Sequence, residues 1–138
     1  ISPYVRDVLE MADVIILCPS NPWLSILPII SLQGVQKILG NKITIAVSPI
    51  VGNSAIKGPA AKIFLEMGIE PSAVEIAKIY KEYIKGFVLD ELNRNESSTI
   101  SSWGIIPFVT NTIMKDSSTK ISLAERILRF IEKFNKDN

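Results

Sequence analysis

The chain has 138 residues, 47% of them apolar and 21% charged, which is enough for one compact domain with a substantial core. Its formal net charge of +1, with no basic block, makes duplex nucleic acid a poor partner. The absence of histidine excludes Ser–His and Cys–His catalysis and imidazole-based zinc sites, and the single cysteine excludes an internal disulfide and a thiolate metal cluster.

No apolar run reaches the roughly 20 residues that a membrane-spanning helix needs, and no signal peptide is recognisable. We therefore expect a soluble, cytoplasmic protein without a membrane partner. The chain opens at Ile1 and not at a methionine, which leaves open that it is a fragment or a processed product.

The first residues predict a helix and a strand. Pro3–Met11 is typical of a short helix, with three apolar residues, Val5, Val8 and Leu9, on one side. Residues 14–18 form an apolar run without a polar alternate, which is typical of a strand covered on both faces. We expect a parallel sheet to begin here.

A proline-bracketed polar turn at residues 19–22 ends this strand, and a helix is predicted at 25–39. Cys18, at the end of the apolar run, is expected to be an inert buried thiol. A strand, a tight polar turn containing Ser20 and Asn21, and a helix start together present free backbone N–H groups. Such a site stabilises an anion such as a phosphate.

Strands and helices alternate over the rest of the chain. Strands are predicted at 43–48, 87–89 and 105–109, a loop at 49–57, and helices at 59–67, 72–84 and from 122 onward. Ser-x-x-Glu capping boxes at Ser72 and Ser122 start two of these helices. Pro107 indicates that the last strand either lies at a sheet edge or begins late. The final helix should turn its apolar residues inward, namely Leu123, Ile127, Phe130, Ile131 and Phe134. The alternation predicts a single three-layer, Rossmann-like α/β domain over residues 1–138 with a mainly parallel sheet.

Polar residues gather where each predicted strand ends. They are Ser20 and Asn21, then Ser48 with Gly52, Asn53 and Ser54, then Asp90 and Glu91, then Thr110, Asn111 and Thr112. Ligands of open parallel sheets bind beyond the carboxyl ends of the strands, so this edge is the candidate binding site.

Each of these residues also has a purely structural interpretation. Ser20 and Asn21 are ordinary turn residues, Asp90 suits the start of a helix, and structural roles are favoured for Thr110 and Thr112. The two tryptophans are expected to pack in or beside the core.

Three motifs together resemble a known family. P-S-N-P-x-x-S-I-x-P-I begins at Pro19, S-P-I-V-G begins at Ser48, and K-G-P-A begins at Lys57. With GFVLDE before Leu92 and a T-N-T-I-M segment from Thr110, the chain is similar over nearly its whole length to the carboxyl-terminal half of the 2-phospho-L-lactate transferases.

This resemblance implies a reaction and a set of partners. A transferase of this type moves a phospholactyl or phosphoenolpyruvyl group from a guanosine-diphosphate adduct to a deazaflavin and releases GMP, a step in making the deazaflavin coenzyme F-420. Magnesium would assist, with ligands expected in an amino-terminal half that this chain does not contain. A homodimer is a further expectation, and the catalytic residues stay unknown.

The resemblance also implies site residues. Ser20, Asn21 and Ser25 would face substrate. Gly52, Lys57 and Gly58 would lie near the anionic groups of the donor, and Asp90 would contact a substrate hydroxyl or base.

Two departures from the family pattern matter. Asn111 stands where the family usually has an aspartate, and the family's members are about twice as long, so we expect this chain alone to be inactive. A related family of nucleotide-sugar-binding regulators, of the gluconeogenesis-factor type, is the alternative, although Asn21 and Pro22 depart from its motif. A non-catalytic interaction module is a third possibility.

Overall fold

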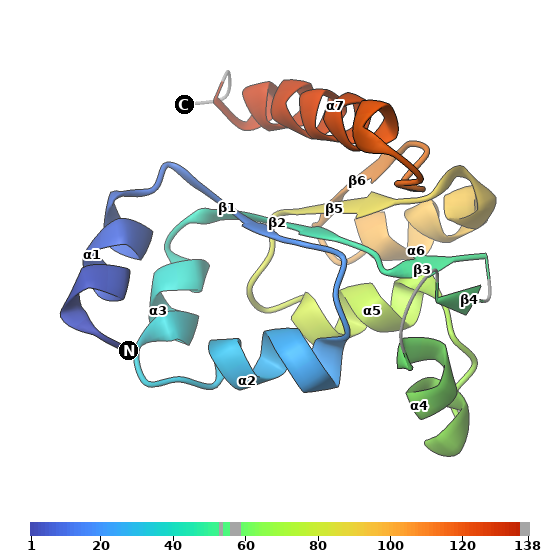
Figure 1. Ribbon diagram of the computed structural model, residues 1–138, viewed down its shortest axis with the longest axis horizontal. Helices are drawn as coiled ribbons and strands as arrows, with labels where there is room; N and C mark the ends of the chain where they lie inside the picture. Colours follow the sequence, from blue (N-terminus) through green and yellow to red (C-terminus); the bar gives the residue numbers. More distant parts are fainter. Residues whose placement is uncertain (53, 56–58, 136–138) are drawn as a thin grey trace.

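Four parallel strands form the main sheet of the computed structural model, which describes residues 1–52, 54–55 and 59–135 (Figure 1). The strands are β1 (Val14–Leu17), β2 (Ile43–Val47), β5 (Gly86–Leu89) and β6 (Ile106–Val109). They lie in the order β1-β2-β5-β6, and every neighbouring pair is parallel. Each later strand of this sheet therefore lies on the same side of the strand before it.

Helices cover the two faces of this sheet unequally. The described helices are α1 (Pro3–Met11), the π-helical η1 (Pro22–Ile26), α2 (Leu27–Ile30), α3 (Val35–Gly40), α4 (Ala60–Glu66), α5 (Ala73–Tyr80), the 3₁₀-helical η2 (Glu91–Glu96), α6 (Ser97–Ser101) and α7 (Ser117–Asn135). Residues of α2, α3, α5 and α6 share one core with the lower face of the sheet in Figure 1, whereas α7 packs on the upper face. The predicted three-layer, Rossmann-like α/β architecture is confirmed.

The core under α7 is small and combines mostly aliphatic side chains with a few aromatic rings. Its buried residues on the sheet are Ile45, Val47 and Val88, and on α7 they are Leu123, Ile127, Phe130 and Ile131. The Phe108 and Phe130 rings stack with their centroids 4.9 Å apart. The inward face predicted for the last helix is thus confirmed, because its residues recur at helical spacing and all meet the same sheet.

The prediction that the first strand is covered on both faces is wrong. β1 is an edge strand in the described chain, and the Ile16 side chain is 40% exposed. Cys18 is exposed as well, so the prediction of a buried thiol fails with it. An apolar run shows that a strand tolerates burial on both faces. How buried the strand is depends on how many elements pack against it.

The long helix predicted at 25–39 is broken into η1, α2 and α3. Gly34 has φ +90, a left-handed conformation that ends one helical segment and begins the next. A Cβ at this position would lie 3.2 Å from the guanidinium nitrogens of Arg6, which passes close to it from α1. The break therefore lets α3 lie beside α1.

Three further boundaries differ from prediction. A two-stranded hairpin of β3 (Ile50–Val51) and β4 (Ser54–Ala55) lies within the expected loop at 49–57. α5 begins at the Ser72 cap as predicted but ends at Tyr80, four residues early. α7 begins at Ser117, because Asp116 accepts a hydrogen bond from the Thr119 N–H (2.8 Å), so the expected start at Ser122 is wrong.

The position of the fourth predicted strand in the sheet agrees with the structure. β6, which contains Pro107, is the other edge of the sheet as predicted. Among the described residues, none of the helices combines the length and the hydropathy that a bilayer crossing requires.

Candidate functional site

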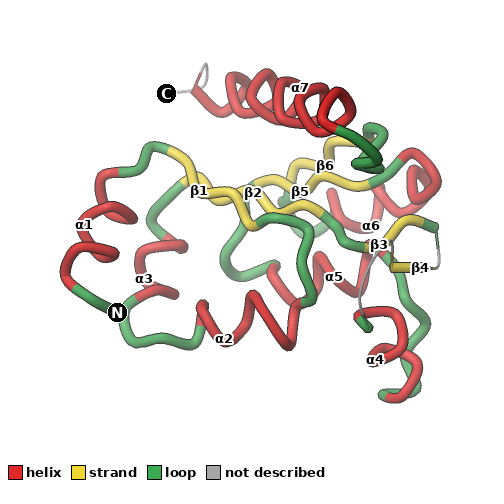
Figure 2. The backbone as a smooth tube through the Cα atoms, viewed as in Figure 1, coloured by secondary structure: helices red, strands yellow, loops and turns green. Residues whose placement is uncertain are grey.

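The four strands, yellow in Figure 2, are parallel, so their carboxyl ends lie along one side of the sheet. Ser20 and Asn21 follow β1, Ser48 follows β2, Asp90 follows β5 and Thr110 follows β6. This edge is where open parallel sheets bind their ligands. The gathering of polar residues predicted from the sequence is therefore present, and the contacts of each residue decide what it can do.

Asn21 fixes the turn after β1 and leaves one buried group without a partner. Its side-chain oxygen accepts hydrogen bonds from the N–H groups of Trp23 and Leu24, both at 3.0 Å, and so caps η1. Those two bonds identify the oxygen, so the other branch is the NH₂ group. This nitrogen is buried and has no hydrogen-bond partner among the described residues. It is a donor in need of an acceptor.

The residues around Asn21 differ in their exposure. Ser20 is half-buried and Ser25 is exposed on η1. Trp23 packs edge-on against Phe64 of α4, with ring centroids 4.6 Å apart, which confirms the expected packing role of this tryptophan. The turn after β1 is therefore exposed at Leu24 and Ser25, and Trp23 packs it against α4.

Gly52 is tied to a distant segment by Asn93. The Gly52 N–H donates to the Asn93 side-chain oxygen (2.8 Å), and the Asn93 NH₂ donates to the Gly52 carbonyl (3.0 Å). Asn93 also donates to Glu96, whose second oxygen accepts the Val74 N–H at the start of α5 (2.7 Å). Since the Gly52 N–H is already used, it is not free for an anion in this conformation.

Asp90 is buried and fully engaged within the protein. One carboxylate oxygen accepts from the Leu92 N–H (3.0 Å) and caps η2, which confirms its structural interpretation. The other accepts from the N–H (2.8 Å) and the hydroxyl (3.1 Å) of Thr112. The carboxylate thereby joins the end of β5 to the loop after β6.

Two more polar residues of this edge are structural. Ser48 is buried and its hydroxyl bonds with the backbone of Ile50, accepting from its N–H at 3.1 Å. Thr110 is buried and its hydroxyl accepts from the Arg126 guanidinium of α7 (2.9 Å).

Other predicted residues cannot be placed, and one set of residues was missed. Asn53, Lys57 and Gly58 lie outside the described residues. Neither Asn93 nor Glu96 was singled out from the sequence, because each acts on a residue at least 22 positions away, a distance at which no local pattern gives a signal.

A comparison with known protein families decides to which family this chain belongs. The sequence model of "2-phospho-L-lactate transferase CofD" matches residues 1–104. The chain belongs to the CofD family. The resemblance found in the motifs is thereby confirmed.

Two relatives are similar to nearly the whole of this chain. The chain is 39% identical over 124 residues to the 2-phospho-L-lactate transferase of Methanocaldococcus jannaschii, which covers 90% of this chain and 39% of that protein. It is 37% identical over 129 residues to the enzyme of the same name in Methanosarcina mazei, with 94% and 43% coverage. This CofD chain thus spans about two fifths of the length of the curated relatives it matches.

Proposed function

We propose that this chain is part of a transferase that moves a phospholactyl or phosphoenolpyruvyl group from a guanosine-diphosphate adduct to a deazaflavin, with release of GMP. Family membership and the names of the two relatives support a phospholactate transferase. The observation that carries the proposal to a particular place is the unpartnered NH₂ group of Asn21. A buried donor of this kind is stabilised by an acceptor on a bound ligand.

The proposed roles divide along the sheet edge. Ser20, Asn21 and Ser25 would contact the donor substrate, since Ser20 is half-buried, Ser25 is exposed and Asn21 holds the unpartnered group. Asp90 and Gly52 would act by positioning, because their described polar groups already bond within the protein. Lys57 and Gly58 stay predictions, as do the cytoplasmic location and a homodimer.

Magnesium is proposed as a cofactor bound by residues outside this chain. Among the described residues, no three acidic or cysteine side chains come together in a group that could hold a metal ion. Asp90, the buried carboxylate of this edge, already accepts three hydrogen bonds. The residues described here therefore do not fit a magnesium site, and we assign no step of the reaction to one.

Asn21→Asp tests the proposal without removing the cap of η1. The remaining carboxylate oxygen still accepts from Trp23 and Leu24, whereas the donor is lost and a negative charge is added. We expect GDP to raise the melting temperature of the wild-type chain, and the variant to bind GDP about tenfold or more weakly.

Asn111→Asp is the matched control. Asn111 caps a similar turn after β6 through its oxygen, which accepts from the Ile113 N–H (2.9 Å), and it is exposed. The charge change is the same, so GDP affinity should stay near the wild-type value. Equal losses in the two variants would contradict the proposal. A UDP-sugar that stabilised the chain more than GDP would favour the regulator alternative.

A further inference from the structure

A cavity lined by positively charged side chains lies between α1 and α3, which run side by side (Figure 1). Its volume is about 280 Å³. The charged residues that line it are Arg6 and Glu10 on α1, Lys37 on α3, and Lys42, which immediately precedes β2. Since α1 leads into β1 and Lys42 leads into β2, this α1–α3 cavity lies toward the amino ends of the strands. It is therefore on the side of the sheet away from the candidate site.

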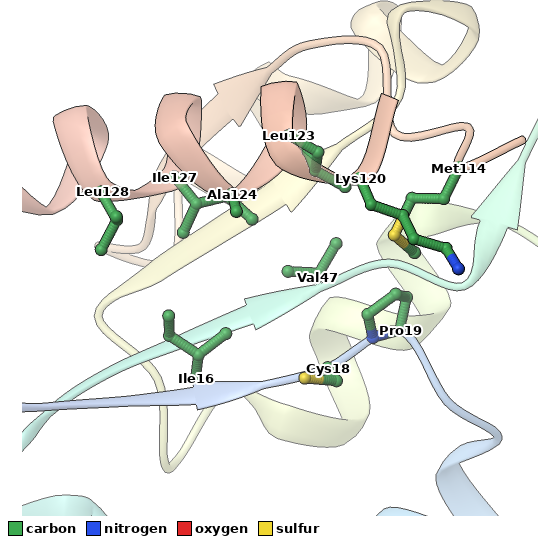
Figure 3. Close-up of a pocket in the computed structure, with 10 residues that line it drawn as sticks. All are labelled: Ile16, Cys18, Pro19, Val47, Met114, Lys120, Leu123, Ala124, Ile127 and Leu128. Atoms are coloured by element: carbon green, nitrogen blue, oxygen red, sulfur yellow. The ribbon is translucent and has the colours of Figure 1, made fainter. Parts of the chain in front are cut away.

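The α1–α3 cavity differs in chemistry from the apolar groove between β1 and α7 (Figure 3). Ile16 of β1 lines that groove together with Val47 and with Leu123 of α7, and Lys120 is the one charged side chain among its ten lining residues. Between α1 and α3, four of the seven lining residues are charged, three positively and one negatively. A cavity with an excess of one sign of charge raises the local concentration of the opposite ion. The α1–α3 cavity is thus suited to an anion.

The charged groups of this cavity do not neutralise one another. Arg6 and Glu10 stand four residues apart on α1, a spacing at which side chains on a helix can form an ion pair. Within the described residues, neither of them belongs to an ion pair, and neither do Lys37 and Lys42. The three positive charges therefore have no counter-ion in the described part of the chain.

Two of the three cationic groups are held in place by the backbone. The Lys42 ammonium donates a hydrogen bond to the backbone carbonyl of Glu10 near the end of α1. The Arg6 guanidinium lies against Gly34, where a Cβ would come within 3.2 Å of both its terminal nitrogens. The missing side chain of Gly34 therefore makes room for Arg6. Groups that are fixed before a ligand arrives lose less side-chain entropy when they bind it.

We propose that the α1–α3 cavity binds a small phosphate-bearing anion. The planar guanidinium of Arg6 matches two phosphate oxygens at once, and the ammonium groups of Lys37 and Lys42 add positive charge from the other wall. Ligand pockets in proteins measure roughly 300–1,000 Å³, so a cavity of about 280 Å³ takes a small molecule and not a polymer. The inference rests on these residues and is independent of the proposed function.

Binding in this cavity has a consequence for α1. None of the residues of this helix is buried, so few contacts hold it to the rest of the domain. An anion that bridges Arg6 on α1 and Lys37 on α3 links the two helices. Local opening of α1 should then become rarer, and its amides should exchange with solvent more slowly.

Inorganic pyrophosphate is the probe for the first experiment. We expect its titration into the wild-type chain to shift the backbone amide NMR signals of Gly34, Lys37 and Asn41, with a dissociation constant below about 1 mM at low ionic strength. Added NaCl should weaken the binding, because exposed charges are screened by salt. Hydrogen exchange over Pro3–Met11 should slow as the site fills.

Two double variants form a matched pair. Arg6→Gln with Lys37→Gln removes two charges from the cavity, whereas Arg129→Gln with Lys133→Gln removes two charges from α7, and all four residues are exposed on helices. The first variant should bind pyrophosphate about tenfold or more weakly at the α1–α3 amides. The second should stay within about twofold of the wild-type value. Circular dichroism checks that both variants are folded.

Asn21→Asp separates this site from the proposed function. It alters the turn after β1, so it should leave the pyrophosphate shifts at Gly34 and Lys37 unchanged even where it weakens GDP binding. Two results would overturn the inference. One is the absence of any pyrophosphate response at the α1–α3 amides of the folded wild-type chain. The other is an equal loss in the two double variants, which would show a general response to net charge.

Discussion

Polar residues follow the carboxyl ends of β1, β5 and β6, but those after β1 (the β1 end) make different contacts from those after β5 and β6 (the β5–β6 end). At the β5–β6 end, the Asp90 carboxylate, the Asn93 amide and the Thr110 hydroxyl all have hydrogen-bond partners within the protein. At the β1 end, Ser25 is exposed and the buried NH₂ group of Asn21 has no partner in the described chain.

This difference separates structure from binding. A polar group that is buried and satisfied holds the loops in place, whereas a buried donor without an acceptor costs free energy until a ligand supplies one. The β5–β6 end therefore holds the loops of the candidate site together, and the proposed function places ligand binding at the β1 end. Three predictions test this division.

Asp90→Ala should cause the largest loss of stability. The substitution leaves the Leu92 and Thr112 donors without their acceptor in a buried place, which should lower the free energy of unfolding by about 3 kcal/mol. Urea denaturation measures it. Ser25→Ala at the exposed β1 end should change stability by less than about 0.5 kcal/mol. Similar effects at the two positions would contradict the division.

Val88→Ala and Ile16→Ala compare the middle of the sheet with its β1 edge. Val88 is fully buried beneath α7, so truncation should cost about 2 kcal/mol. Ile16 points to the same face, but its partial exposure should limit the loss to under about 1 kcal/mol. Thermal unfolding and urea unfolding should both show a larger loss of stability for Val88→Ala than for Ile16→Ala. An equal or larger loss for Ile16 would mean that the edge is already packed in this chain.

The smallest effect concerns the start of α7, the helix that covers the β5–β6 end. The Thr119 N–H and then its hydroxyl bond to Asp116 and hold the pKa of this carboxyl below its usual value. The ionised form is thus favoured in the folded protein. Its stabilising contribution is present above the usual pKa and is lost as the pH falls through the lowered value. Asp116→Asn should remove this acid dependence, and NMR titration of the carboxyl should give a midpoint below the usual range. A midpoint at the usual value would contradict this assignment.

Much of the local structure follows from residues close together in the sequence. The limits of α1, the capping of α5 by Ser72 and the inward face of α7 all come from helical periodicity and short-range hydrogen bonds. The alternation of strands and helices likewise predicts the parallel sheet and the edge where its polar residues gather. These interactions span a few residues, so the sequence by itself determines them.

The tertiary structure decided the rest. Asn93 reaches Gly52 across 41 positions, and Asp90 reaches Thr112 across 22, so only folding shows that these polar groups are satisfied. The exposure of Ile16 and Cys18 depends on which neighbours β1 receives, which an apolar run does not encode. Local patterns set what a residue can do, and contacts between distant segments set what is left for a ligand or a partner to do.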